Sequence, residues 1–403
     1  MLKHRGSASI FFMLGLIVMK KILAFVALVL LSSCLDTPTG NLPSISQDEI
    51  TKEAERQKRI SYSKYIDQLS LAKKIGYKIN LANADICNKV DYLSGITFAN
   101  DDIIGTKIAK YFPSKLNISP KVSIIDIVED SPADKAGLLI GDQILKLGDY
   151  ELPEGKKAIE KISKHFKKLE NEEIQKITIN RYGDIKTIEF TKNKLCNYPI
   201  ILTQDNIVNA YADGKRTIMT QGMMDYVKDD NELALVIAHE LAHNDRGHLE
   251  AKKKNTMIMG SIGMILDLVT IYYSGGTAGG DAQNTEMWAK IGAQAYSVEF
   301  EKDADYGGVY YAYRAGYDIS NAHKLWERIG SENPKQIAIS STHPATAERY
   351  LQIKKTVAEI NKKKSEGLAL VPNEKEKKKE KAEKKKKKKF NLKNILKKKD
   401  KEE

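Results

Sequence analysis

Residues 229–243 read DDNELALVIAHELAH, a run of good helix formers that ends in an HExxH motif. Its acidic and Asn residues at the start are N-cap candidates, which favours a helix beginning there. Positions four apart share one face of a helix, so His239 and His243 can bind the same metal ion. Glu240 lies between them, where its carboxylate can reach the hydrolytic water. Neutral imidazole is a good zinc ligand, and the motif therefore indicates metal-assisted hydrolysis of an amide bond.

The HExxH pair needs a third ligand from elsewhere in the chain. A metzincin places a third His six residues after the second, but that residue is Leu249, so this class is excluded. His248 comes one residue before that position, and we expect it to cap or pack near the helix end. Residues 297–305 read SVEFEKDAD, and a second helix there would place Glu301 and Asp305 on one face. Glu301 can complete a His, His, Glu site, and Asp305 can orient a ligand histidine.

A β-rich stretch precedes this region and resembles the PDZ domain family. Residues 128–145 read VEDSPADKAGLLIGDQIL, which matches the family pattern SPAxxAGLxxGDxI. Pro132 begins a short helix, and the glycines supply the turns. Residues 176–181 and 185–190 alternate in polarity and predict a hairpin. PDZ folds bind extended peptides by strand addition, and a rigid spacer is the alternative role.

Four motifs in order resemble the HtpX-type family of gluzincin metallopeptidases, which includes the CAAX prenyl proteases and soluble periplasmic chaperone-proteases. They are NAYADG at 209–214, HELAH at 239–243, EKDAD at 301–305 and STHP at 341–344, the last followed by Arg349.

The resemblance implies a role for each matching residue. His239, His243 and Glu301 should bind one zinc ion per chain, with Asp305 supporting them and Glu240 as the general base. His343 should either stabilise the oxyanion or act as a removable fourth ligand, with Arg349 supporting it. The substrate should lie as an added strand beside Asn209, Ala210 and Gly214.

The N-terminal region predicts export. Residues 1–33 contain a signal peptide whose true start is Met19, followed by an apolar run and the lipobox LSSC with Cys34 as the lipidated residue. A plain membrane anchor is the alternative. The two remaining cysteines, Cys87 and Cys196, form an even pair on either side of the PDZ segment, and in an exported chain they predict a disulfide.

Charge argues against nucleic acid as a partner. The net charge is +12, but the tail from Asn373 holds 16 Lys against 7 acids, and residues 1–33 hold four basic residues. The remaining body carries about −1 and has no basic patch with interleaved aromatics. We expect the tail to be disordered, and a role for it at the membrane is open.

These observations predict an α+β protein: a mainly helical zinc-peptidase domain with a small edge sheet, and an inserted β-rich PDZ domain. The expected segments are the signal peptide at 1–33, a linker and helix at 34–95, the PDZ domain at 96–192, the peptidase domain at 193–362 and a Lys-rich tail at 363–403.

We expect a zinc endopeptidase in the bacterial periplasm that acts on extended or misfolded polypeptides. It would be lipid-anchored, with the outer membrane favoured over the inner. Its PDZ domain would take C-terminal or extended peptides. One alternative is a lipoprotein chaperone or adaptor that holds clients through the PDZ domain with little turnover. Another is an intramembrane protease that uses the apolar run at 257–273 as a span, although 17 residues is short for one.

Overall fold

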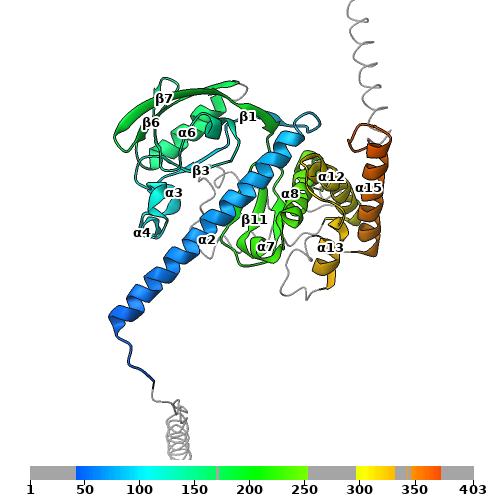
Figure 1. The fold of residues 1–403 in the computed structure, drawn as a ribbon, viewed down its shortest axis with the longest axis horizontal. Coiled ribbons are helices and arrows are strands. Elements are labelled where there is room, and N and C mark those ends of the chain that lie inside the picture. Colours follow the sequence, from blue (N-terminus) through cyan, green and yellow to red (C-terminus); the bar gives the residue numbers. More distant parts are fainter. Residues whose placement is uncertain (1–41, 169–171, 253–295, 332–342, 344–345, 374–403) are drawn as a thin grey trace, which may run out of the picture. The chain divides into compact units, whose positions relative to one another are not determined.

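The computed structural model describes five parts of the chain, namely residues 42–168, 172–252, 296–331, 343 and 346–373 (Figure 1). Helices in these parts accompany three small sheets, which confirms the predicted α+β class. The signal segment, Cys34, the run 257–273 and the tail from 374 lie outside the described residues. No helix within the described parts has the length and hydropathy needed to cross a membrane.

The helices in the described parts are α2 (Gln47–Ala82), α3 (Asp101–Ile104), α4 (Thr106–Ala109), α5 (Pro132–Lys135), α6 (Lys156–Lys168), α7 (Gln221–Tyr226), α8 (Asp230–Asp245), α12 (Val298–Arg314), α13 (Ala322–Ser331) and α15 (Ala347–Ser365), with a 3-10 turn at Ser114–Leu116. The strands are β1 (Val90–Leu93), β2 (Ile96–Ala99), β3 (Ser123–Ile127), β4 (Gln143–Leu147), β5 (Tyr150–Glu151), β6 (Ile174–Arg181), β7 (Asp184–Thr191), β8 (Asn193–Cys196), β9 (Ile200–Thr203), β10 (Ala210–Ala212) and β11 (Thr217–Thr220).

The PDZ segment forms a six-stranded sheet in the order β2-β3-β4-β6-β7, with β5 paired to β4. The SPAxxAG pattern folds as expected: Ser131 caps α5 by accepting from the Asp134 amide, and Pro132 occupies its first turn. The predicted hairpin is confirmed, because β6 and β7 pair from Arg181 opposite Asp184 onward. Its two turn residues both have positive φ, as a type I′ turn requires. Strand β2 is an edge of this sheet.

Helix α2 is longer than the sequence pattern predicts. Charged residues with an apolar periodicity over 46–76 predict a helix there, whereas α2 continues to Ala82. The reason is that Ile79 remains fully buried in the larger hydrophobic core, so the apolar face extends one more turn. Asn83 follows the helix and donates to Ile79 O at 2.8 Å, which satisfies a carbonyl of the last turn.

A disulfide closes the neck of the PDZ segment. Cys87 and Cys196 are bonded, with Cα atoms 5.9 Å apart and a sequence separation of 109. Beside the bond, β1 and β8 pair antiparallel from Val90 opposite Cys196 to Leu93 opposite Asn193. The chain therefore enters and leaves the PDZ segment through one covalently joined ribbon.

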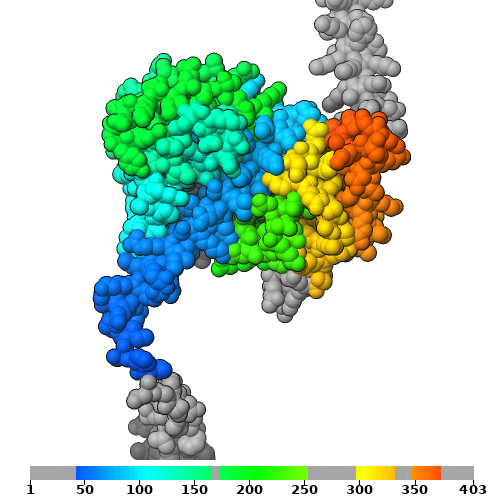
Figure 2. All heavy atoms as spheres, in the orientation of Figure 1, coloured from blue at the N-terminus to red at the C-terminus, as the bar shows by residue number. Residues whose placement is uncertain are grey.

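The region after the PDZ segment supplies the candidate site. A three-stranded sheet in the order β10-β11-β9 precedes helices α7 and α8, and α8 packs against α12. Helices α13 and α15 lie side by side, yellow and orange in Figure 2, and α15 packs on α12. The metal-motif helix α8 is buried along nearly its whole length.

Candidate metal centre

Helix α8 carries the HExxH residues, and its start follows from its sequence. The Asp229 side chain accepts from the Asn231 and Glu232 amides at 2.9 Å each, which satisfies two of the four amides that a helix N-terminus leaves unpaired. The following residues are apolar on every face, because α8 is surrounded by the sheet and by helices. His239 and His243 are consequently held 2% and 1% exposed.

Two adjacent glycines on α12 bring it close to α8. A Cβ added to Gly308 would lie 2.9 Å from the backbone N and Cα of His239, and one added to Gly307 would lie 2.6 Å from the Arg246 side chain. Real Cβ atoms do not approach so closely, so any side chain at Gly308 would push the helices apart. This close approach lets Glu301, two turns earlier on α12, reach the histidines of α8.

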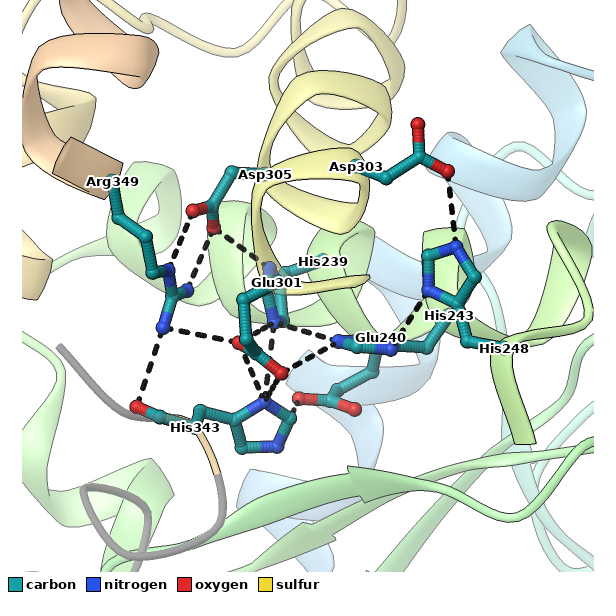
Figure 3. Close-up of polar contacts among 9 residues, drawn as sticks. All are labelled: His239, Glu240, His243, His248, Glu301, Asp303, Asp305, His343 and Arg349. Atoms are coloured by element: carbon teal, nitrogen blue, oxygen red, sulfur yellow. Dashed lines mark hydrogen bonds and ion pairs between the residues drawn. The ribbon is translucent and has the colours of Figure 1, made fainter. Parts of the chain in front are cut away.

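Four side chains from three segments converge on one point (Figure 3). The Nε2 atoms of His239 and His243 are 3.1 Å apart, and they lie 3.4 Å from Glu301 Oε2 and Oε1, respectively. His343 brings Nδ1 to 3.0 Å from Glu301 Oε1 and 3.3 Å from His239 Nε2. All four residues are almost completely buried.

This arrangement fits a zinc ion. In a tetrahedral site with bonds of about 2.0–2.1 Å, neighbouring ligand atoms lie roughly 3.3 Å apart. The spacings between the donor atoms of His239, His243, Glu301 and His343 fall near that value. The donor set, three imidazoles and one carboxylate, is also of the type that zinc prefers. Burial disfavours the charge on Glu301, but the surrounding histidines hold its pKa well below the ordinary range, so it is an anionic donor.

Glu240 is placed as the sequence analysis requires of a base. Its side chain is completely buried, and neither carboxylate oxygen accepts a hydrogen bond from any residue that the structure describes. Oε1 lies 3.4 Å from His343 Nε2, so the carboxylate faces the cluster of donors. Burial raises the pKa of Glu240 above its ordinary value. A buried carboxylate with unused acceptors is costly unless a water molecule or ligand meets it, which is what hydrolysis needs there.

Asp305 and Arg349 support the cluster. Asp305 Oδ1 lies 3.0 Å from His239 Nδ1, which leaves Nε2 of that ring for the metal. Arg349 binds Asp305 through two bonds of 2.7 and 2.8 Å, and its Nη1 lies 3.0 Å from Glu301 Oε2. The same Nη1 donates to the carbonyl of His343 at 3.3 Å. Arg349 thus joins the third ligand, the residue that orients His239, and the backbone that carries His343.

The proposed substrate strand is an edge strand. Among the described strands β10 pairs only with β11, and Ala210 lies opposite Met219. Asn209 O accepts from the Thr220 amide, and the Asp213 amide donates to Arg216 O. Backbone groups alternate along an antiparallel pair, so those of Ala210 and Ala212 face the other edge. The amide of Gly214 is already bonded to Asn244 Oδ1 at 2.7 Å, so Gly214 positions the hairpin instead.

Three supporting residues follow the HExxH motif, and two of them, Asn244 and Asp245, escaped the sequence analysis. Asn244 holds the β10–β11 hairpin through Gly214 N and, at 2.9 Å, Arg216 O. Asp245 accepts from Asn88, next to the disulfide, and from the Tyr198 and Tyr311 hydroxyls. His248 lies against His243 rather than merely ending the helix. The sequence signal that could have indicated these residues is the run of polar side chains directly after the HExxH motif.

Two segments of the chain match models of known families. Residues 168–357 match the model of peptidase family M48, and residues 95–191 match that of the PDZ domain. Mitochondrial metalloendopeptidase OMA1 of Schizosaccharomyces pombe is 28% identical over 166 residues, which covers 40% of this chain and 47% of that protein. OMA1 of Arabidopsis thaliana is 30% identical over 194 residues, 47% of this chain and 37% of that protein.

Metalloprotease LoiP of Escherichia coli strain K12 is 28% identical over 162 residues, which covers 39% of this chain and 61% of LoiP. The chain therefore spans less than two thirds of each of these three relatives. The family matches agree with the resemblance drawn from the four motifs.

Proposed function

We propose that this chain, which belongs to peptidase family M48 and also carries a PDZ domain, is a zinc-dependent endopeptidase of the bacterial envelope. The single observation that supports this most is the buried cluster of His239, His243, Glu301 and His343 with the buried carboxylate of Glu240 facing it. The donor spacing suits zinc, and the position of Glu240 suits a general base.

The residues of the chain divide the work of peptide hydrolysis. Zinc, when bound, acts as a Lewis acid on the scissile carbonyl and on the attacking water. Glu240 accepts a proton as the water oxygen bonds to the carbonyl carbon. It then delivers that proton to the amine nitrogen as the C–N bond breaks. Asp305 and Arg349 keep His239 and Glu301 in place throughout.

His343 is best explained as a displaceable fourth ligand. Its Nδ1 lies within the ring of donors, 3.0 Å from Glu301 Oε1, where a substrate carbonyl or water would otherwise sit. Catalytic zinc sites keep one position open, so His343 has to move before the substrate is hydrolysed. The alternative role is that His343 donates to the oxyanion.

The substrate is proposed to be an extended polypeptide. The outward backbone groups of Ala210 and Ala212 can pair with it as an added strand once the Ala210 amide releases Asn209 Oδ1, to which it donates at 3.0 Å. This pairing would fix the scissile carbonyl relative to the metal. In the PDZ segment, β2 is also an edge strand, which suits binding of a C-terminal or extended peptide. Two edges of this kind favour unfolded chains over compact folded proteins.

The proposed location is the periplasm, with a lipid at Cys34 and a role in protein quality control. Support comes from the lipobox pattern before residue 35 and from the Cys87–Cys196 disulfide, which is typical of oxidising compartments. The Lys-rich tail would add attraction to an anionic membrane.

A client-binding adaptor with little turnover is the second candidate. The position of His343 favours it, because a site with four protein ligands is typical of structural zinc.

Casein cleavage separates these two functions. The wild-type protein should cleave casein, lose this activity when a chelator removes the metal, and regain it with one equivalent of zinc. The Glu299→Ala variant is a matched control and should cleave casein as the wild-type protein does, because Glu299 is exposed on the same helix as Glu301. Casein that is bound but left intact by the zinc-loaded protein would support the adaptor. Cleavage that persists after the metal has been removed would contradict the proposed mechanism.

A further inference from the structure

His248 is a buried histidine that the mechanism above does not use. It lies just beyond α8 and is 3% exposed. Gly247 precedes it with φ of +66°, a left-handed conformation that ends α8 before the backbone becomes helical again at residue 248. The turn brings the His248 ring to 4.9 Å from the His243 ring, in an edge-on arrangement, and equally close to Phe300.

The contact between the two rings fixes which nitrogens carry protons. The Nδ1 atoms of His243 and His248 are 3.0 Å apart. Nε2 of His243 is the atom directed at the metal position, so the ring proton of neutral His243 must be on Nδ1. His248 Nδ1 therefore accepts it, and the proton of His248 must be on Nε2.

The second nitrogen of His248 meets a matching acceptor. Nε2 lies 3.0 Å from Asp303 Oδ2, and Arg246 Nη1 donates to the other oxygen of Asp303 at 2.6 Å. Both ring nitrogens of His248 thus have a partner, and Figure 3 shows the contacts with His243 and Asp303. The contacts link the ring of His243 through His248 to the carboxylate of Asp303, which the Arg246 guanidinium holds.

The other ligand histidine is supported in a parallel way. His239 Nδ1 lies 3.0 Å from Asp305, which Arg349 holds. Asp303 and Asp305 both come from α12, two and four residues after Glu301, and Figure 3 shows them on opposite sides of the site. Asp305 reaches its histidine directly, whereas Asp303 reaches His243 only through the ring of His248.

We propose that His248 is a positioning residue that fixes the tautomer and ring orientation of His243 for metal binding, with Asp303 as its anchor. The inference rests on the proposed metal site, but not on peptidase activity. Groups that orient metal ligands typically change metal affinity by about 10–100-fold when they are removed. His248 should therefore control zinc affinity without itself touching zinc.

The test compares two substitutions, one that keeps an acceptor for His243 and one that removes it. In His248→Asn the amide oxygen takes the place of Nδ1 and can still accept from His243, whereas His248→Phe keeps the ring but offers no acceptor. Zinc dissociation constants are measured by competition with a chromophoric chelator, and the thermal midpoint is measured on the metal-free protein. His248→Phe should weaken zinc binding roughly 10–100-fold, and His248→Asn should recover most of the loss.

Three results would overturn the proposal. One is wild-type zinc affinity in His248→Phe. Another is equal weakening in the Asn and Phe variants, which would indicate packing rather than orientation. If His248→Phe does not fold, Asp303→Ala replaces it, because Asp303 is 30% exposed, and Glu299→Ala on the same helix is its control. The third result that would overturn the proposal is then that Asp303→Ala binds zinc as tightly as Glu299→Ala does.

The outcome is separable from that of the casein assay. A wild-type protein that binds zinc but cleaves nothing would refute the peptidase and leave the role of His248 testable. Variants with unchanged zinc affinity in an active peptidase would refute only the positioning role.

Discussion

Removing the Cys87–Cys196 disulfide should destabilise the protein greatly without changing its metal site. The bond closes a loop with a sequence separation of 109 residues. In the chain-entropy model, a loop of that length restricts the unfolded state by about 4–5 kcal/mol. The folded state keeps other connections at the neck, because β1 pairs with β8 and Asn88 bonds to Asp245 twice at 2.7 Å.

The assay is urea unfolding of the Cys87→Ser/Cys196→Ser double variant, followed by tryptophan fluorescence. Trp326 is a suitable reporter, since it is 3% exposed and its ring is 4.8 Å from that of His239. With a slope of about 2 kcal/mol per M, the midpoint should fall by roughly 2 M urea. The zinc dissociation constant should stay within about twofold of wild type, a range set by the ordinary size of distant effects.

Two results would refute this reasoning. An unchanged midpoint would mean that the unfolded chain is already restricted without the bond. A large loss of zinc affinity would mean that the bond, and not the β1–β8 ladder with Asn88, holds Asp245 and the end of α8. Adding reductant to the wild-type protein is the matched control, and it should reproduce the shift seen in the double variant.

The remaining predictions concern the metal cluster and the tail. Glu301→Ala should lose zinc when the metal is limiting, as measured by metal analysis, whereas Asp305→Asn should weaken zinc binding by about 10–100-fold. A full zinc content in Glu301→Ala would mean that the third ligand is another residue. His343→Ala should raise the rate of casein cleavage if the His343 ring blocks the site, or lower that rate by roughly 10²–10³-fold if the ring stabilises the oxyanion. An unchanged rate would contradict both roles. Deleting residues 374–403 should reduce binding of the delipidated protein to anionic vesicles at low salt, and equal binding would exclude a membrane role for the tail.

Local rules predicted the parts of the molecule that depend on a single segment. The HExxH spacing placed His239 and His243 on one helix face, and the spacing of Glu301 and Asp305 did the same on the second helix. The PDZ hairpin followed from alternation around a Gly turn. Each of these needs only the period of one element and the chemistry of its side chains.

Features that depend on two packed segments were not predictable in this way. Nothing local in the sequence indicates that Gly308 faces the backbone of His239 on α8, or that Gly307 faces the Arg246 side chain. His248 was expected to pack near the helix end, but its pairing with His243 requires the left-handed turn and a carboxylate from another helix. Sequence spacing also could not show that Gly214 would bond to Asn244 rather than to a substrate. In each case, tertiary packing selects one of several partners that the sequence allows.

The central claim is that Glu240 acts as the base at a zinc site, and Glu240→Gln tests it most directly. Gln keeps the size of the side chain but cannot accept the proton from the water. Zinc content by metal analysis and casein cleavage are measured on the same preparation. The account predicts one zinc per chain, as in wild type, and a cleavage rate lower by at least about 10²-fold. Near wild-type cleavage by the zinc-loaded Gln variant would contradict it.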